Sequence, residues 1–182
     1  IAQRRESIRL LDEYLKSVFL EMFGDPSLNP NGFPLRTFRE ISTKISDGPF
    51  GSNLKSAHYV DQGVRVIRLQ NIGVGKFVDE DKAYISDDHF ATLSKHECLP
   101  NDVLVGTLGD PNLRACIQPT WLRRALNKAD CVQIRVNPKK AIPEYVVALI
   151  NQPSTARMAQ GLMLGQTRTR ISMGRLRDLP IP

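Results

Sequence analysis

The chain has 182 residues, of which 41% are hydrophobic and 24% charged, and these ordinary globular values exclude wholesale disorder. No apolar run approaches the roughly 20 residues of a membrane-spanning helix, so we expect no membrane span. The net charge of +6 favours a polyanionic partner. The three cysteines form no CxxC pair, which is typical of free thiols in a reducing compartment.

The first predicted element is a helix over residues 1–23. Its apolar residues follow the alternating three- and four-residue spacing of a heptad, and we call five of them the seam: Ile8, Leu11, Leu15, Val18 and Met22. The turn residues Gly24-Asp25-Pro26 should end this helix, which would reach roughly 35 Å. The seam predicts packing against a partner helix, and packing on a single core is the alternative.

Residues 24–34 are dense in turn residues and mark a domain boundary, with a helical part over 1–24 and a globular domain over 25–182. In the globular part we expect helices over 36–42, 87–95, 143–151, 154–160 and 173–179, and strands over 64–69, 102–108 and 131–136. Strands and helices mix without regular alternation. The predicted fold class is therefore α+β, a mixed-sheet domain preceded by a long coiled-coil-type helix.

Catalytic motifs are weak throughout the chain. His89, His96 and Cys98 have no usual metal-ligand spacing, so we expect no metal site. A nuclease match of Asp61 with Glu80-Asp81-Lys82 is nominal, and an exposed turn explains the triplet more simply. The chain also lacks the Pro-Pro pair typical of amino-methylation motifs. These observations predict a protein without catalytic residues.

Positive charge gathers in two segments, because residues 112–140 carry a net charge of +6 and residues 151–182 a net charge of +4. The loop over 47–55 contains small polar residues that let backbone N–H groups approach phosphates closely. The predicted nucleic-acid contacts are Ser52, Asn53, Lys55, Arg114, Arg123, Arg124, Lys128, Arg168 and Arg170. Solvated surface is the alternative for each basic run, and a core role is the alternative for the nearby Trp121.

The chain resembles the specificity subunit of Type I restriction–modification systems along nearly its whole length. The features that carry this resemblance are, in order, Ser17–Pro26, Asp47–Lys55, Tyr59, Gly63, Val66–Arg68, Asn71–Gly73, Tyr84–Ser86, Leu99–Leu104, Gly165–Arg168, Ile171-Ser172 and Leu179–Pro182. One departure is Asn101, which stands where that family often has Gly; Asn tolerates the same turn geometry.

The resemblance implies a non-catalytic, cytoplasmic protein of a bacterium or archaeon that reads one half of a bipartite double-stranded DNA target. The helix would bind the modification (methyltransferase) subunits, which hold S-adenosylmethionine, or a second copy of the chain; the restriction subunit would be engaged indirectly. No cofactor is expected in this chain. The family's full subunit has two such domains, so we expect a fragment or a half-subunit.

Among the predicted contacts, we expect Arg123 and Arg124 to read bases and Lys55 to bind a phosphate. Two other functions stay open from the sequence. One is the C-terminal recognition domain of a fused restriction–methyltransferase enzyme. The other is an adaptor module that binds no DNA.

Overall fold

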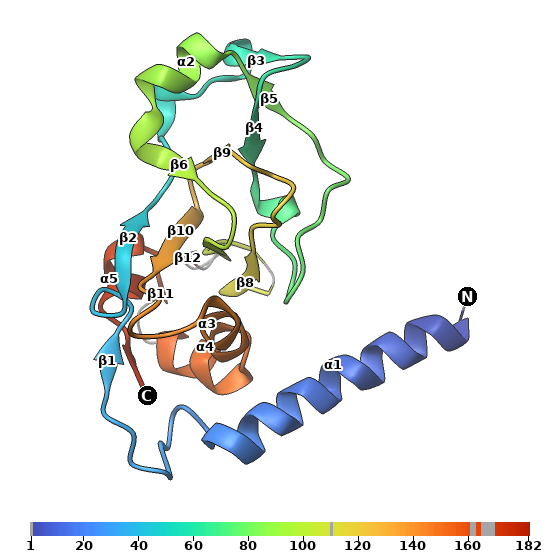
Figure 1. Cartoon of the computed structure of the whole chain (residues 1–182), viewed down its shortest axis with the longest axis vertical. Coiled ribbons are helices and arrows are strands. Elements are labelled where there is room, and N and C mark those ends of the chain that lie inside the picture. Colours follow the sequence, from blue (N-terminus) through green and yellow to red (C-terminus); the bar gives the residue numbers. More distant parts are fainter. Residues whose placement is uncertain (1, 110, 161–162, 165–169) are drawn as a thin grey trace.

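The computed structural model describes residues 2–109, 111–160, 163–164 and 170–182 and shows the predicted α+β fold (Figure 1). A long helix leads into a domain in which two sheets lie one above the other; the short helices over 143–150 and 153–160 lie at the end nearest the long helix, and the short helix over 87–92 lies at the opposite end. The helices are α1 (Ala2–Phe23), α2 (Asp87–Thr92), α3 (Pro143–Ile150), α4 (Pro153–Gln160) and α5 (Met173–Arg177). None of the described helices is both long and apolar enough to cross a membrane.

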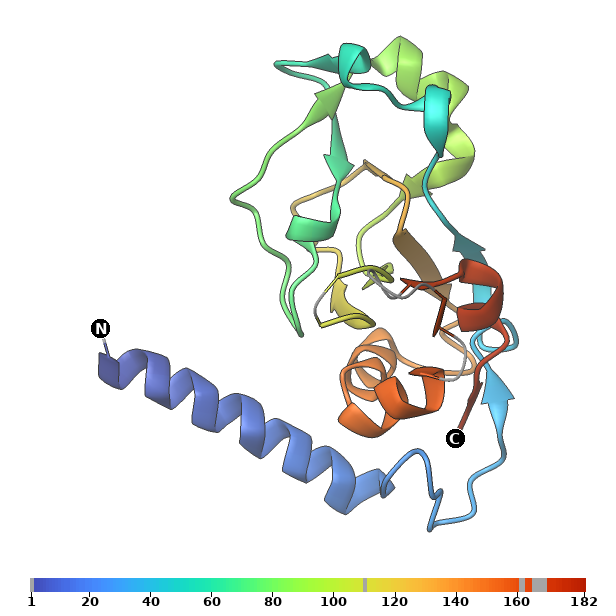
Figure 2. The same ribbon diagram turned by 180° about the vertical axis from the view of Figure 1, so that it is seen from behind.

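Helix α1 docks on the domain through its C-terminal end. Phe19 is buried there, and the rings of Phe19 and Phe23 lie 5.8 and 5.1 Å from the ring of Tyr145 on α3. The rest of α1 projects away from the domain in both views (Figures 1 and 2). Gly24 ends the helix at a φ of +78°, where its N–H donates to the Leu20 carbonyl oxygen.

The proximal sheet, next to α3 and α4, is antiparallel and has the strand order β2-β10-β7-β8. Its strands are β2 (Ser42–Ser46), β7 (Val103–Gly106), β8 (Arg114–Ile117) and β10 (Cys131–Val136). Alternation along the strands turns Val103, Val105, Val132 and Ile134 toward one face, where α3 completes the largest core cluster. A two-strand pair of β1 (Arg36–Thr37) and β13 (Pro180–Ile181) closes this end.

The distal sheet has the order β3-β5-β4-β9-β6, with β4 and β9 parallel. Its strands are β3 (Tyr59–Val60), β4 (Val64–Ile67), β5 (Tyr84–Ile85), β6 (Glu97–Cys98) and β9 (Ala125–Asn127). One face packs with the proximal sheet in a shared cluster that includes Ile67 and Leu104. The other face, which carries Val66 and Leu126, is covered by Leu54 and by Phe90 of α2.

Most of the predicted elements are confirmed, although the helix expected over 36–42 is wrong. That segment contains β1, a tight turn and the first residue of β2, because β1 pairs with β13 and β2 pairs with β10. The strand predicted over 64–69 ends at Ile67, and a 3₁₀ turn follows over Leu69–Asn71. The domain boundary at residues 24 and 25 stays a prediction.

Candidate nucleic-acid interface

The loop over 47–55 is fixed to the segment 128–130, which links β9 to β10. Asp47 Oδ1 accepts hydrogen bonds from the N–H groups of Gly48 (2.8 Å) and Asp130 (3.0 Å). The ring Nδ1 of His96 also contacts the Asp47 carbonyl oxygen. Gly48 lies against the backbone of Lys128 so closely that a Cβ there would sit 2.1 Å from the Lys128 carbonyl carbon. The first glycine of the loop is thus required by packing.

Replacing Gly48 by Ala should lower the free energy of unfolding by roughly 1–3 kcal/mol, since the new methyl group meets backbone that cannot move aside cheaply. Urea denaturation measures this loss. Gly174→Ala is the matched control, because a Cβ at Gly174 meets nothing within 4 Å and Ala favours the helix α5. Equal stability of both variants would show that the loop does not pack as described.

The other predicted residues of this loop are exposed and lie against α2. Ser52, Asn53 and Lys55 are all exposed, in or beside two 3₁₀ turns. His89 of α2 places its Nε2 3.0 Å from the Asn53 carbonyl oxygen, and the Lys55 N–H donates to His58 Nδ1 at 3.1 Å. The segment that carries these three exposed residues therefore lies beside α2 at one end of the domain (Figure 1).

Two predicted cations lie on the same face of the distal sheet, at opposite ends of β9. Arg124 and Lys128 lie two residues before and two residues after the buried Leu126. Because successive side chains of a strand point to opposite faces, all three side chains lie on the same face of the sheet. Arg124 forms an ion pair with Asp87 and lies 4.7 Å from the Phe90 ring centroid.

At the other end of β9, the Lys128 ammonium lies 5.6 Å from the ring centroid of Tyr59. The guanidinium of Arg68 lies 6.0 Å from the same ring and pairs with Asp81. Arg68 is not among the predicted contacts, because its position on the strand predicted over 64–69 favours a structural role or a contact with the DNA backbone. The pairing of parallel β4 with β9 brings Arg68 beside Lys128.

Arg170 joins this region from a distant part of the sequence. It begins β12 (Arg170–Ile171), which pairs with β11 (Met163–Leu164). Its Nε lies 2.7 Å from Asp130 Oδ1, and its guanidinium lies 5.3 Å from the ring centroid of Phe50 in the 47–55 loop. Arg168 lies outside the described residues. We call Ser52, Asn53, Lys55, Arg124, Lys128 and Arg170 the interface cluster.

Arg114 has a structural role instead. Its guanidinium donates to the carbonyl oxygens of Ile72, Leu108, Pro111 and Leu69 at 2.6–3.1 Å, which ties β8 to two neighbouring loops. A guanidinium with four carbonyl acceptors has few donors left for a phosphate. We therefore leave Arg114 out of the interface cluster.

Arg123 and Trp121 lie on a separate loop before β9. Both are exposed, and they flank the buried Leu122. Trp121 makes an edge contact with Phe77 at 5.9 Å between centroids, so it is a surface aromatic and not a core residue. Arg123 has no hydrogen bond or ion pair to the part of the chain that the structure describes.

Asp47 is the titratable group that the loop geometry perturbs most clearly. Burial raises the pKa of its carboxyl group to about 6, the Gly48 N–H lowers the pKa, and the neighbouring Asp130 carboxylate raises it. The folded state thus binds a proton more tightly than an unfolded Asp with a pKa near 3.9. Lowering the pH from 7 to 4 should therefore raise the free energy of unfolding, because protonation of Asp47 removes the cost of burying its charge.

Asp47→Asn should raise the free energy of unfolding at pH 8 by roughly 1–3 kcal/mol and flatten its pH dependence between pH 4 and 7. The amide oxygen still accepts the two N–H groups, while the buried charge is gone. Thermal unfolding across this pH range measures both effects. The exposed Asp61→Asn is the control and should change neither; a destabilised Asp47→Asn would contradict the burial of a charge at this site.

The described residues bring no group of three or more His, Cys, Asp or Glu together as a metal site. Cys98, Cys116 and Cys131 are buried, and burial raises the pKa of each thiol far above that of a reactive cysteine. These thiols therefore act as small core residues.

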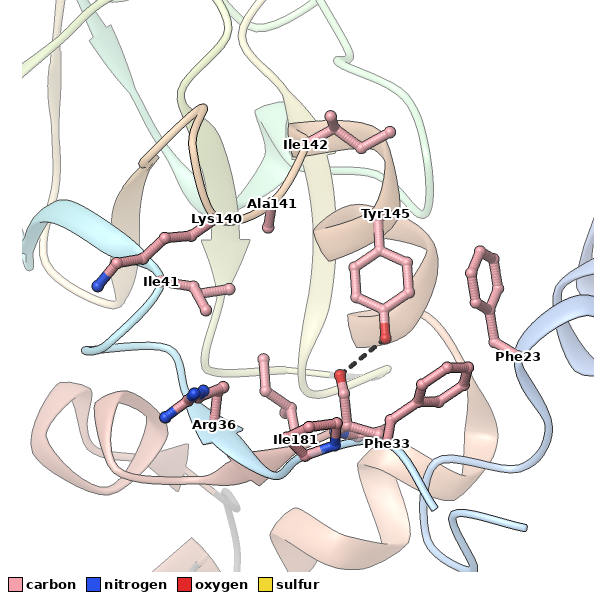
Figure 3. A pocket seen from close by; sticks show the side chains of 11 residues that line it. Phe23, Phe33, Arg36, Ile41, Lys140, Ala141, Ile142, Tyr145 and Ile181 are labelled. Carbon is pink, nitrogen blue, oxygen red and sulfur yellow. Dashed lines mark hydrogen bonds between the residues drawn. The ribbon is translucent and has the colours of Figure 1, made fainter. Parts of the chain in front are cut away.

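A groove with a volume of about 550 Å³ lies at the other end of the domain, beside the C-terminal end of α1 (Figure 3). Its walls are mostly apolar and include Phe23, Phe33, Ile142 and Ile181. Within this groove, the Tyr145 hydroxyl donates a hydrogen bond to the Pro182 carbonyl oxygen at 2.8 Å. An apolar groove of this kind does not suit a nucleic acid.

Comparison with solved structures identifies the fold. A chain from a study of complex assembly and conformational transition of the type I R-M system aligns with a TM-score of 0.66 at 15% identity, over 100% of this chain and 42% of that one. The HsdS subunit of Thermoanaerobacter tengcongensis aligns at 0.60 with 15% identity, over 100% and 41% of the two chains.

The Type I restriction–modification S subunit of M. genitalium aligns at a TM-score of 0.52 with 16% identity, over 86% of this chain and 36% of that one. No protein-family model and no curated protein matched the sequence. The chain therefore spans about two-fifths of the length of the solved proteins it matches, and it has the fold of this part of an S subunit.

Proposed function

We propose that this chain is the DNA-recognition part of a Type I specificity subunit, with residues 25–182 as a target recognition domain that reads one half of a bipartite DNA target. The observation that supports this most is the interface cluster. Two cations that are distant in the sequence lie close to the 47–55 loop in a domain with the S-subunit fold, because Gly48 packs against the backbone of Lys128 and the guanidinium of Arg170 lies 5.3 Å from the Phe50 ring centroid.

In the proposed enzyme, DNA recognition and catalysis belong to different subunits. The chain recognises DNA and carries out no chemistry, while modification subunits that bind the seam of α1 hold S-adenosylmethionine. The restriction subunit joins through the modification subunits. The exposed seam supports this assembly, because Ile8, Leu11, Leu15 and Met22 are each 55–65% exposed.

Three cations are available for phosphates. Lys55, Arg123 and Lys128 form no ion pair within the described ranges, unlike Arg124 and Arg170. The sequence predicts that both Arg123 and Arg124 read bases. Because no hydrogen bond or ion pair among the described residues orients Arg123, we place Arg123 with the phosphate contacts and keep Arg124 as a base contact. Phosphate contacts supply most of the affinity and make binding depend on salt.

Salt titration of duplex DNA binding tests this proposal. If these three cations each neutralise one phosphate, log K should fall against log salt with a slope near −2.7. Lys55→Ala, Arg123→Ala and Lys128→Ala should each flatten the slope by about 0.9 and weaken all sequences alike. Lys139→Ala, on an exposed loop just before α3, is the control. Binding that is absent, or unaffected by salt, would favour an adaptor that binds no DNA.

A further inference from the structure

Arg170, like Arg68 and Arg124, combines an ion pair with a nearby aromatic ring, but its partner Asp130 is the least exposed of the three carboxylates, at 18% against 33% for Asp81 and 72% for Asp87. The Arg170 Nε forms an ion pair with Asp130 Oδ1 at 2.7 Å, and its guanidinium carbon lies 5.3 Å from the ring centroid of the exposed Phe50. Its two terminal nitrogens have no hydrogen-bond partner in the residues that the structure describes, and its side chain is 41% exposed. The guanidinium is thus oriented at one edge and open at the other.

Asp130 is itself rigid. Its side chain is only 18% exposed, and its backbone has the left-handed φ of +66° that Asp tolerates better than most residues. The Asp130 N–H donates to Asp47, and its carbonyl oxygen accepts from both the N–H and the hydroxyl of Thr107. A carboxylate fixed in this way limits the rotamers of the arginine that it holds.

We propose that Arg170 is a specificity-determining residue that donates two hydrogen bonds to the O6 and N7 atoms of a guanine in the major groove, with Asp130 as its positioning residue. This rests on the proposed function. A fixed guanidinium with two parallel donors matches these two acceptors. A phosphate fits the same donors, but the Asp130 carboxylate repels it, whereas the guanine edge is uncharged.

Arg170→Lys keeps the charge and removes the paired donors. In the full chain, binding to duplexes that differ at single positions should lose roughly 5- to 150-fold of discrimination at one G·C pair, with the other preferences kept. Asp130→Asn keeps the left-handed backbone and removes the carboxylate. It should reduce discrimination at the same pair while overall affinity stays equal or rises, since one negative charge is gone.

Arg157→Lys and Asp88→Asn are the matched controls, because Arg157 is an exposed arginine that pairs with Asp25 outside the interface cluster and Asp88 is an exposed aspartate; neither should change a base preference. Circular dichroism and thermal unfolding establish that each variant is folded. The inference is overturned if Arg170→Lys and Asp130→Asn leave every base preference of the chain intact. It is equally overturned if Arg170→Ala weakens all sequences alike and flattens the salt slope, because Arg170 is then a phosphate contact. If the chain without substitutions shows no base preference, the result contradicts the proposed function itself and not only the role of Arg170.

Discussion

Replacing Asp102 by Ala is expected to lower the free energy of unfolding by about 3–5 kcal/mol, because the change removes the acceptor of a buried hydrogen-bond network. Asp102 is 2% exposed and accepts four hydrogen bonds: from the Leu99 N–H (2.7 Å), from Gln133 Nε2 (2.8 Å) and from two nitrogens of Arg135 (2.8 Å each). Removing the carboxylate leaves a buried amide and a half-buried guanidinium without their acceptor.

Urea denaturation measures this loss. Asp102→Asn should cost less, because one amide oxygen still accepts, and the exposed Asp61→Ala should cost little. The same network explains the Leu99–Leu104 motif, since Asn101 has the positive φ of 69° that lets Asp102 turn inward. A loss below about 1 kcal/mol for Asp102→Ala would show that this network is not a main support of the fold.

The pair of changes Leu11→Asp and Leu15→Asp is expected to abolish association through the seam and to leave residues 35–182 folded. Burying each such side chain against a partner helix contributes roughly 1.5–3 kcal/mol, and two carboxylates in the seam reverse that gain. The domain should survive because α1 docks through Phe19 and Phe23, which lie beyond both changes.

Analytical ultracentrifugation of the chain alone and with the modification subunit measures this association. Ser7→Asp with Ser17→Asp adds the same charge to α1 at positions off the seam and is the control. Association that persists unchanged in the Leu11→Asp, Leu15→Asp variant would place the interface elsewhere.

The local sequence pattern predicts those helices and strands whose own residues strongly favour one secondary structure, whichever distant strand pairs with them. Helix α1 follows from an uninterrupted heptad ended by Gly24, and β10 follows from a β-branched run closed by Asn137-Pro138. The segment 36–42 and the short strand β9 depend on which distant strand pairs with them, and no local pattern carries that information.

The predicted DNA contacts also divide into what the local sequence predicts and what only the tertiary structure determines. Charge and spacing predict that Arg114 and Arg170 are alike, since each is an arginine in a basic segment. Folding surrounds Arg114 with four carbonyl oxygens and places Arg170 between Asp130 and Phe50, which lie 40 and 120 positions earlier in the chain. The acceptor that meets each guanidinium is a property of the tertiary structure, so the sequence alone could not separate a structural arginine from an interface arginine.

The proposed sequence-specific recognition is tested most directly by selecting duplexes that the chain binds from a library with random base pairs, at a salt concentration where nonspecific binding is weak. We predict enrichment of one short sequence that contains a G·C pair whose preference disappears with Arg170→Lys. Bound duplexes without any enriched sequence, at every salt concentration that permits binding, would contradict the recognition of a DNA target by this domain.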